Sequence, residues 1–170
     1  KYQLFDMASG EVLAKGLCDR IGIDGRITHK RPGHENYVEE ISFKNHDEAL
    51  ACVIRLLTDE NLGVLKSIDE ISAVGHRVAH GGEKYTKSAL VDDEMIRYLE
   101  SIDNINPLHG PPAIVGMKAC RKLMPNVKMA AVFDTSFYSE IPDYAYIYPL
   151  PYEFYKEHKI RKYGFHGTSH

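Results

Sequence analysis

The spacing of apolar residues changes near residue 45, and this change limits the possible folds more than any other feature of the chain. Before it, residues 2–7, 11–21 and 37–43 are short runs rich in Val, Ile, Leu, Tyr and Phe, separated by turns that contain Gly and Asp. Such runs predict three strands joined by hairpin-like turns. From Asn45 onward apolar residues recur with a period of about 3.6, which predicts a helix.

The rest of the chain alternates between strand-like and helix-like patterns. Strands are predicted at 71–80 and 127–133, helices at 91–102 and from Pro111 or Pro112 toward Met124, a short helix at 151–158 and a short strand at 163–165. Proline fits a first helical turn, where its missing N–H is not needed. Because no repeat, low-complexity tract or linker interrupts this order, we expect one continuous unit with a mixed α/β layer architecture.

Composition excludes several classes of protein. The 170 residues are 44% hydrophobic, and charges of both signs are scattered along the chain to give a net charge of −3. We therefore expect no nucleic-acid or membrane partner, and the longest apolar runs are far too short to span a bilayer. Cys18, Cys52 and Cys120 are widely spaced within apolar stretches, which is typical of buried thiols in a reducing compartment, and we expect a cytoplasmic protein.

Polar residues interrupt the predicted strand 71–80 in the run V-G-H-R-V-A-H-G-G. In a strand, Arg77 shares a face with Ala79, so the guanidinium lies beside a very small side chain and can meet an anion. In a helix, His76 and His80 would lie one turn apart and could bind zinc, but Arg77 stands where a metalloprotease needs Glu. The ordinary alternative is an Arg in a structural ion pair.

Two further segments carry polar groups that could act on a ligand. Asp134 ends the apolar run 127–133, and α/β sheets bind ligands at the carboxyl ends of their strands; such an Asp can orient a reacting group or hold Mg²⁺, directly or through water, or simply cap a turn. Glycines flank Phe165 and His166, which predicts a backbone close to a ligand and an imidazole that donates to a phosphoryl oxygen. His170 could join His166 on a metal or be structural.

Four motifs occur in order along the chain: V-G-H-R-V-A-H-G-G-E-K-Y, N-P-L-H-G-P-P, V-F-D-T-S-F and R-K-Y-G-F-H-G-T-S-H. Taken alone, the second places His109 at a helix start, where it can bind an anion or cap. Together the four resemble the acetate kinase (acetokinase) family over essentially the whole chain. The opening Lys1-Tyr2-Gln3-Leu4 is also similar to the lysine end of that family's N-x-G-S-S-S-x-K phosphate-binding element.

The resemblance implies a fold and an organisation. The fold would be α/β and ribonuclease H-like, as in actin-like ATPases, with a mixed sheet and helices on both faces. Residues 1–170 would form a single N-terminal domain, incomplete at both ends, without its first strand and without the C-terminal nucleotide-binding domain. The chain alone would be inactive, because the adenosine site, a second arginine, a metal-binding glutamate and most of the dimer interface would lie outside it.

The resemblance also implies residue roles. Arg77 would bind the acetate carboxylate and the transferring phosphoryl group, Asp134 would orient the reactants and support Mg²⁺, and His166 would stabilise the transition state. His109 would lie in the substrate site, and Lys1 would lie near the nucleotide phosphates. The small apolar pocket that receives the acetate methyl would be lined by Leu108, Phe165 and Ala79. The family often has valine in place of Ala79, so a roomier pocket could accept propionate.

The implied activity is that of an ATP:acetate phosphotransferase, which moves the γ-phosphoryl group of ATP in line to acetate and gives acetyl phosphate and ADP. Mg²⁺ would be the cofactor, and the full-length protein would be a homodimer. The alternatives are a propionate or butyrate kinase, a non-catalytic binding module of the same superfamily, and a zinc hydrolase.

Overall fold

The computed structural model describes all 170 residues, which form two compact units. The first unit contains residues 1–72 and 118–126, and the second contains residues 73–117 and 127–170. The predicted single domain stays a prediction, because two compact units do not by themselves define domains.

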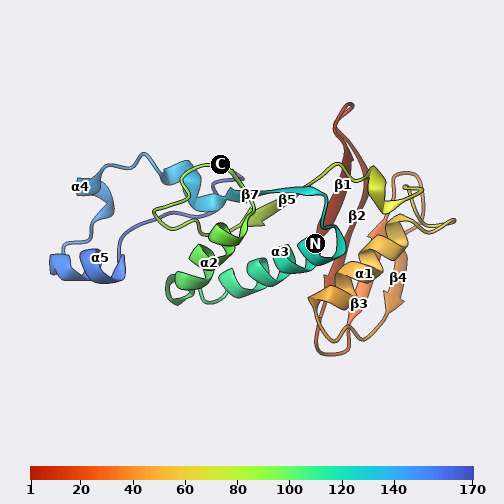
Figure 1. Cartoon of the computed structure of the whole chain (residues 1–170), viewed down its shortest axis with the longest axis horizontal. Helices are drawn as coiled ribbons and strands as arrows, with labels where there is room; N and C mark the ends of the chain where they lie inside the picture. Colours follow the sequence, from red (N-terminus) through yellow and green to blue (C-terminus); the bar gives the residue numbers. More distant parts are fainter. The chain divides into compact units, whose positions relative to one another are not determined.

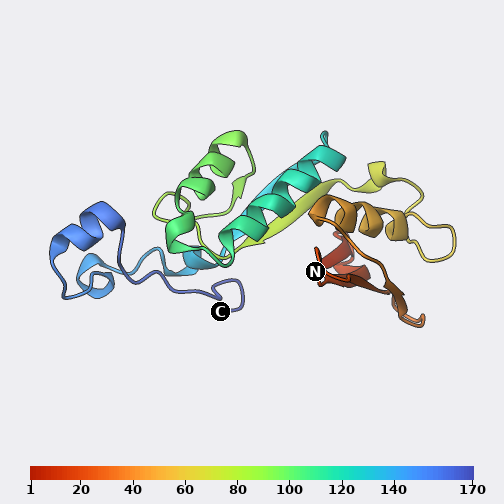
Figure 2. The ribbon, with the colours of Figure 1, turned by 90° about the horizontal axis from the view of Figure 1, so that it is seen from below.

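An antiparallel sheet with the strand order β1-β2-β3-β4 builds the first unit (Figure 1). Its strands are β1 (Tyr2–Asp6), β2 (Glu11–Asp19), β3 (Arg26–Lys30) and β4 (Tyr37–Glu40). Helix α1 (His46–Leu57) begins where the apolar spacing changes, and Asn45 caps it by accepting the N–H of Glu48 at 3.0 Å. The helix covers one face of this sheet (Figure 2), and its apolar face shares a core with Ala14, Ile27 and Phe43.

The strand β3 was not predicted from the sequence. It pairs with both β2 and β4, so it is a central strand, and its inward residues are Ile27 and His29. His29 is buried and hydrogen-bonded at both ring nitrogens, to the Tyr2 hydroxyl at 2.6 Å and to the Leu62 carbonyl at 3.0 Å. Because one of its two core residues is an imidazole, the strand lacks the apolar alternation that reveals a half-buried strand.

A smaller, mixed sheet builds the second unit, in the order β5-β7-β6. Strand β5 (Ala73–Val78) runs parallel to β7 (Lys128–Phe133), and the two-residue β6 (Ala89–Leu90) runs antiparallel to β7. Helices α2 (Asp93–Ser101) and α3 (Gly110–Leu123) contribute to the core of this unit, together with Val78, Ala131 and Phe133 from the strands. The expected mixed sheet is therefore present, but the sheet of the first unit is separate from it and purely antiparallel.

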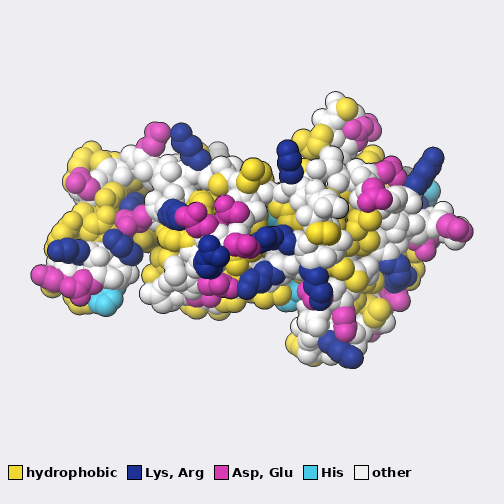
Figure 3. All heavy atoms as spheres, in the orientation of Figure 1, with side chains coloured by type: hydrophobic (Ala, Val, Ile, Leu, Met, Phe, Trp, Pro, Cys, Tyr) yellow, Lys and Arg dark blue, Asp and Glu magenta, His cyan; other side chains and the backbone are white.

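The remaining elements are short. They are the 3₁₀ turns η1 (Ile68–Glu70), η2 (Asp103–Ile105) and η3 (Asp134–Tyr138), and the helices α4 (Asp143–Tyr146) and α5 (Tyr152–His158). The predicted strand at 163–165 is wrong: this segment is a loop, and Gly164 within it has a φ of +84°. Exposed apolar side chains gather over α4 and α5 (Figure 3), and Tyr144, Tyr152 and Phe154 are among them.

No helix combines the length and apolarity that a membrane crossing requires.

Candidate functional site

Two parallel strands bring Arg77 and Asp134 together. Arg77 is the second-last residue of β5 and pairs in register with Val132 of β7, and Asp134 follows directly after β7. Because the strands are parallel, both side chains leave the same edge of the sheet. The Arg77 Nε donates to Asp134 Oδ1 at 3.0 Å and Nη2 donates to Oδ2 at 2.6 Å, so the guanidinium and the carboxylate meet as a two-pronged pair.

The two partners differ in exposure, and this difference decides what the pair can do. The side chain of Asp134 is 2% exposed, whereas that of Arg77 is 58% exposed. The hydrogen bonds from Arg77, and after them that from Thr168, hold the pKa of the Asp134 carboxyl below its usual range against the opposing effect of burial. Asp134 is therefore ionised at neutral pH and fixes one edge of the guanidinium, while the rest of that group faces solvent.

His166 completes a cluster of three side chains. Its Nδ1 lies 3.4 Å from Arg77 Nη2, and because a guanidinium can only donate, Nδ1 is the acceptor in this contact. The proton of the neutral ring then sits on Nε2, which leaves an N–H donor available to a ligand. His166 has a φ of +57°, a left-handed conformation that is uncommon outside glycine and is typical of functional sites.

The loop that carries His166 is fastened to the turn η3. Thr168 donates its hydroxyl to Asp134 Oδ1 at 2.8 Å, and Tyr138 donates its hydroxyl to the carbonyl of Phe165 at 2.9 Å. At Gly167 a Cβ would lie 2.6 Å from that of Phe137, so only glycine lets the two segments approach this closely. The glycine that follows His166 therefore brings the backbone close to η3, and the approach of this backbone to a ligand stays a prediction.

The other predicted site residues occupy different places. Phe165 precedes His166 and is 45% exposed, and Ala79 is half-buried just beyond the end of β5. Leu108 and His109 lie on the exposed loop before α3, and no hydrogen bond joins them to the three clustered side chains. Lys1 is exposed in the first unit and is described with that unit alone.

Sequence reasoning missed two hydroxyl groups that organise the site. Thr168 bonds Asp134, and Thr135 accepts the backbone N–H of Gly81 at 3.0 Å, which ties the residues after β5 to the turn η3. Both threonines lie inside the motifs that carry Asp134 and His166. Thr135 follows Asp134 directly and Thr168 lies two residues after His166, and this proximity could have indicated that their hydroxyls take part in the site.

A zinc site at His76 and His80 does not agree with the structure. Residues 73–78 form a strand rather than a helix, so the two imidazoles are not one helical turn apart. No group of three or more His, Cys, Asp or Glu side chains in the chain is arranged to hold a metal ion.

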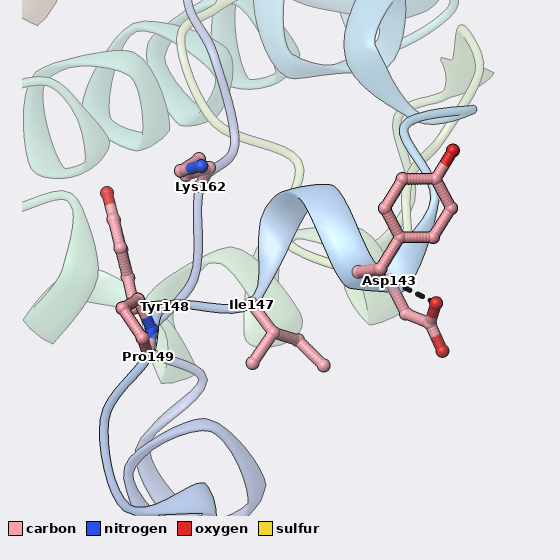
Figure 4. A pocket seen from close by; sticks show the side chains of 6 residues that line it. Asp143, Ile147, Tyr148, Pro149 and Lys162 are labelled. Carbon is pink, nitrogen blue, oxygen red and sulfur yellow. Dashed lines mark hydrogen bonds between the residues drawn. The ribbon is translucent and has the colours of Figure 1, made fainter.

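A surface hollow of about 550 Å³ lies elsewhere, in the segment that contains α4. Figure 4 shows Lys162 and Tyr148 on one side of it and Asp143 on the other, without convergence on one point. Lys162 is the only cationic residue that lines this hollow, and its ammonium donates to the carbonyl of Ala145 at 2.9 Å. None of its lining residues belongs to the Arg77, Asp134 and His166 cluster.

The class of protein that these features define is an α/β protein with a charged site at the carboxyl ends of parallel strands. Comparison with known proteins gives the family. The acetokinase family model matches residues 1–170, and the chain belongs to that family. The chain is 58% identical over 171 residues to an acetate kinase of Clostridium botulinum (strain Alaska E43 / Type E3), with 100% of this chain and 43% of the relative covered.

Solved structures agree with this assignment. The acetate kinase of Porphyromonas gingivalis matches with a TM-score of 0.95 and 39% identity over 99% of this chain and 43% of that one. A propionate kinase from Francisella tularensis matches with a TM-score of 0.89 and 32% identity over 99% of this chain and 42% of that one. These neighbours confirm the predicted α/β, ribonuclease H-like fold class. The chain spans less than half of the length of the relatives that it matches.

Proposed function

We propose that the complete protein containing this chain is an acetate kinase, which transfers the γ-phosphoryl group of ATP to acetate and gives acetyl phosphate and ADP. The observation that supports this most is the meeting of Arg77, Asp134 and His166 at one sheet edge in a chain of the acetokinase family. A phosphoryl group in transfer spreads negative charge over its oxygens, so fixed hydrogen-bond donors are what the reaction needs.

Arg77 and His166 are the proposed donors. Asp134 occupies Nε and one N–H of Nη2, so the guanidinium keeps its Nη1 edge for the acetate carboxylate or the phosphoryl oxygens. The Nε2–H of His166 would donate to a phosphoryl oxygen as charge develops there. No protein nucleophile takes part, because the carboxylate of acetate attacks the phosphorus directly and the ADP oxygen leaves.

Asp134 is proposed to orient this machinery. The paired ions leave no net charge, so the anion is held by directed hydrogen bonds more than by local positive potential. Mg²⁺, when bound, would neutralise phosphate charge in such a reaction. Both oxygens of Asp134 already accept hydrogen bonds, from Arg77 and Thr168, so this carboxylate suits an ion held through water better than direct coordination.

The acyl group is proposed to be surrounded by Phe165, Ala79 and Leu108. His109 is proposed to lie in the substrate site, and Lys1 near the nucleotide phosphates. A cytoplasmic location and a homodimeric complete protein belong to the same proposal, and all of these parts come from the family resemblance. A propionate kinase is the second candidate, because a solved propionate kinase also matches, but with lower identity and a lower TM-score than the acetate kinase.

Alanine substitutions in the complete protein test this proposal. Arg77→Ala and His166→Ala should each lower kcat for acetyl phosphate formation by about 10²-fold or more, because each removes a fixed donor. Arg97→Ala, which removes an exposed arginine of α2 in the same unit, is the matched control and should keep its activity. Circular dichroism should show that the fold survives, and near-normal turnover in either test variant would refute the assigned roles.

A further inference from the structure

His80 lies directly beneath the loop that carries Phe165 and His166. It is 1% exposed, and its ring meets the rings of Tyr163 and Phe165 edge-on, with centroid distances of 4.3 and 5.7 Å. Edge-to-face packing at these distances is directional, so it favours one arrangement of the rings. The roles proposed above for the phosphoryl and acyl contacts do not use this histidine.

The backbone around His80 is fixed independently of those rings. Its Nδ1 accepts the N–H of Gly82 at 2.9 Å, and the N–H of Gly81 donates to Thr135 at 3.0 Å. Burial first, and then the charge of Arg161, lower the pKa of His80 to about 4, so the ring is neutral at physiological pH. The neutral ring of His80 is therefore held in one place, and the rings of Tyr163 and Phe165 pack against it.

The loop above has separate restraints on its backbone and on its rings. Tyr138 holds the carbonyl of Phe165, and Thr168 ties the loop to Asp134, so the main chain stays in place without His80. Phe165 is 45% exposed, and of the other aromatic rings only that of His80 packs against its ring. Loss of the His80 ring should therefore free the ring of Phe165 more than it displaces His166.

We propose that His80 is a positioning residue that sets the place of the Phe165 ring and thereby the length of acyl group that the site accepts. This inference rests on the proposed function, because it takes Phe165 as a wall of the acyl pocket. It predicts an effect on the choice between acids of different length rather than a general loss of turnover.

Two substitutions separate the functions of His80. His80→Asn keeps an acceptor for the Gly82 N–H but loses the aromatic ring, whereas His80→Phe keeps a ring but loses the acceptor. His76→Asn makes the same change within β5, at a histidine whose ring packs against no other aromatic ring, and is the matched control. In the complete protein we would measure kcat/KM for acetate and propionate, KM for ATP, and the thermal midpoint of each variant.

We expect His80→Asn to shift the acetate-to-propionate ratio of kcat/KM by about tenfold toward propionate, the usual scale for one methylene in a pocket. KM for ATP should stay unchanged, and His80→Phe and His76→Asn should keep the wild-type ratio. A wild-type ratio in His80→Asn, or an equal shift in His80→Phe, would overturn the inference.

If His80→Asn does not fold, Tyr163→Leu provides a second test, because it removes the other ring that packs on His80. The same shift is expected, and an unchanged ratio would count against the positioning role. A wild-type protein that forms no acyl phosphate from either acid would instead reject the proposed function and this inference with it. An active wild type with an unchanged ratio in the variants would reject the inference alone.

Discussion

Gly164 has a φ of +84°, and a Cβ at this position would lie 2.5 Å from the ring of Tyr138. Gly164→Ala should therefore cost about 1–3 kcal/mol of unfolding free energy, because alanine is strained in this conformation and also meets the tyrosine. Urea unfolding followed by circular dichroism measures the change. Gly75→Ala is the matched control, because a Cβ there meets nothing within 4 Å; equal stability of the two variants would contradict the expected strain.

The residues of the candidate site were predictable one at a time, but their partners were not. Arg77, Asp134 and His166 stand out in the sequence because each interrupts an apolar or glycine-rich run. The ion pair between the first two joins residues that lie 57 positions apart, and only the parallel pairing of β5 and β7 brings them together. The sequence posed a structural ion pair and an anion site as alternatives for Arg77, and the geometry allows one guanidinium to serve both.

The sequence correctly predicted the helices and strands whose apolar side chains recur with a regular spacing. Helix α1 and strands β5 and β7 were predicted to within a few residues, and Asn45 and Asp92 cap α1 and α2 as side-chain acceptors. The sequence missed β3, where a hydrogen-bonded histidine replaces an apolar core residue, and β6, which is too short to show a period. The segment 163–165 has the apolar pattern of a strand but pairs with no strand. It packs instead against η3, where the Tyr138 hydroxyl donates to the carbonyl of Phe165.

Each of the two units contains a buried, neutral histidine, His29 in the first and His80 in the second. Burial lowers both pKa values, from 6.5 to about 4 for His80. These histidines bind protons more readily in the unfolded chain than in the folded one. The free energy of unfolding is therefore unaffected by them above pH ~6.5, and it decreases as pH falls toward their folded-state pKa. Unfolding free energies measured by urea titration should therefore decline between about pH 6.5 and 4.5.

His80→Phe tests this linkage, because phenylalanine keeps the ring and cannot titrate. Its stability should fall less over the same window, and the contribution of His80 amounts to about 3 kcal/mol when the change is carried to pH 4. Carboxylates with lowered pKa, such as Asp134, lose their contribution only below about pH 4. A His80→Phe profile parallel to the wild type would show that His80 does not titrate on unfolding in this range.

The 170 residues span 43% of the length of an acetate kinase relative, and this limits what they can do alone. The chain supplies one guanidinium, one carboxylate and one imidazole at a common sheet edge, but phosphoryl transfer also needs the nucleotide and its metal to be held in line with the acceptor. We therefore expect no ATP-dependent acetyl phosphate formation by the isolated chain in a hydroxamate assay in which the complete protein turns over. Measurable product from the 170 residues alone would mean that they hold a nucleotide site of their own.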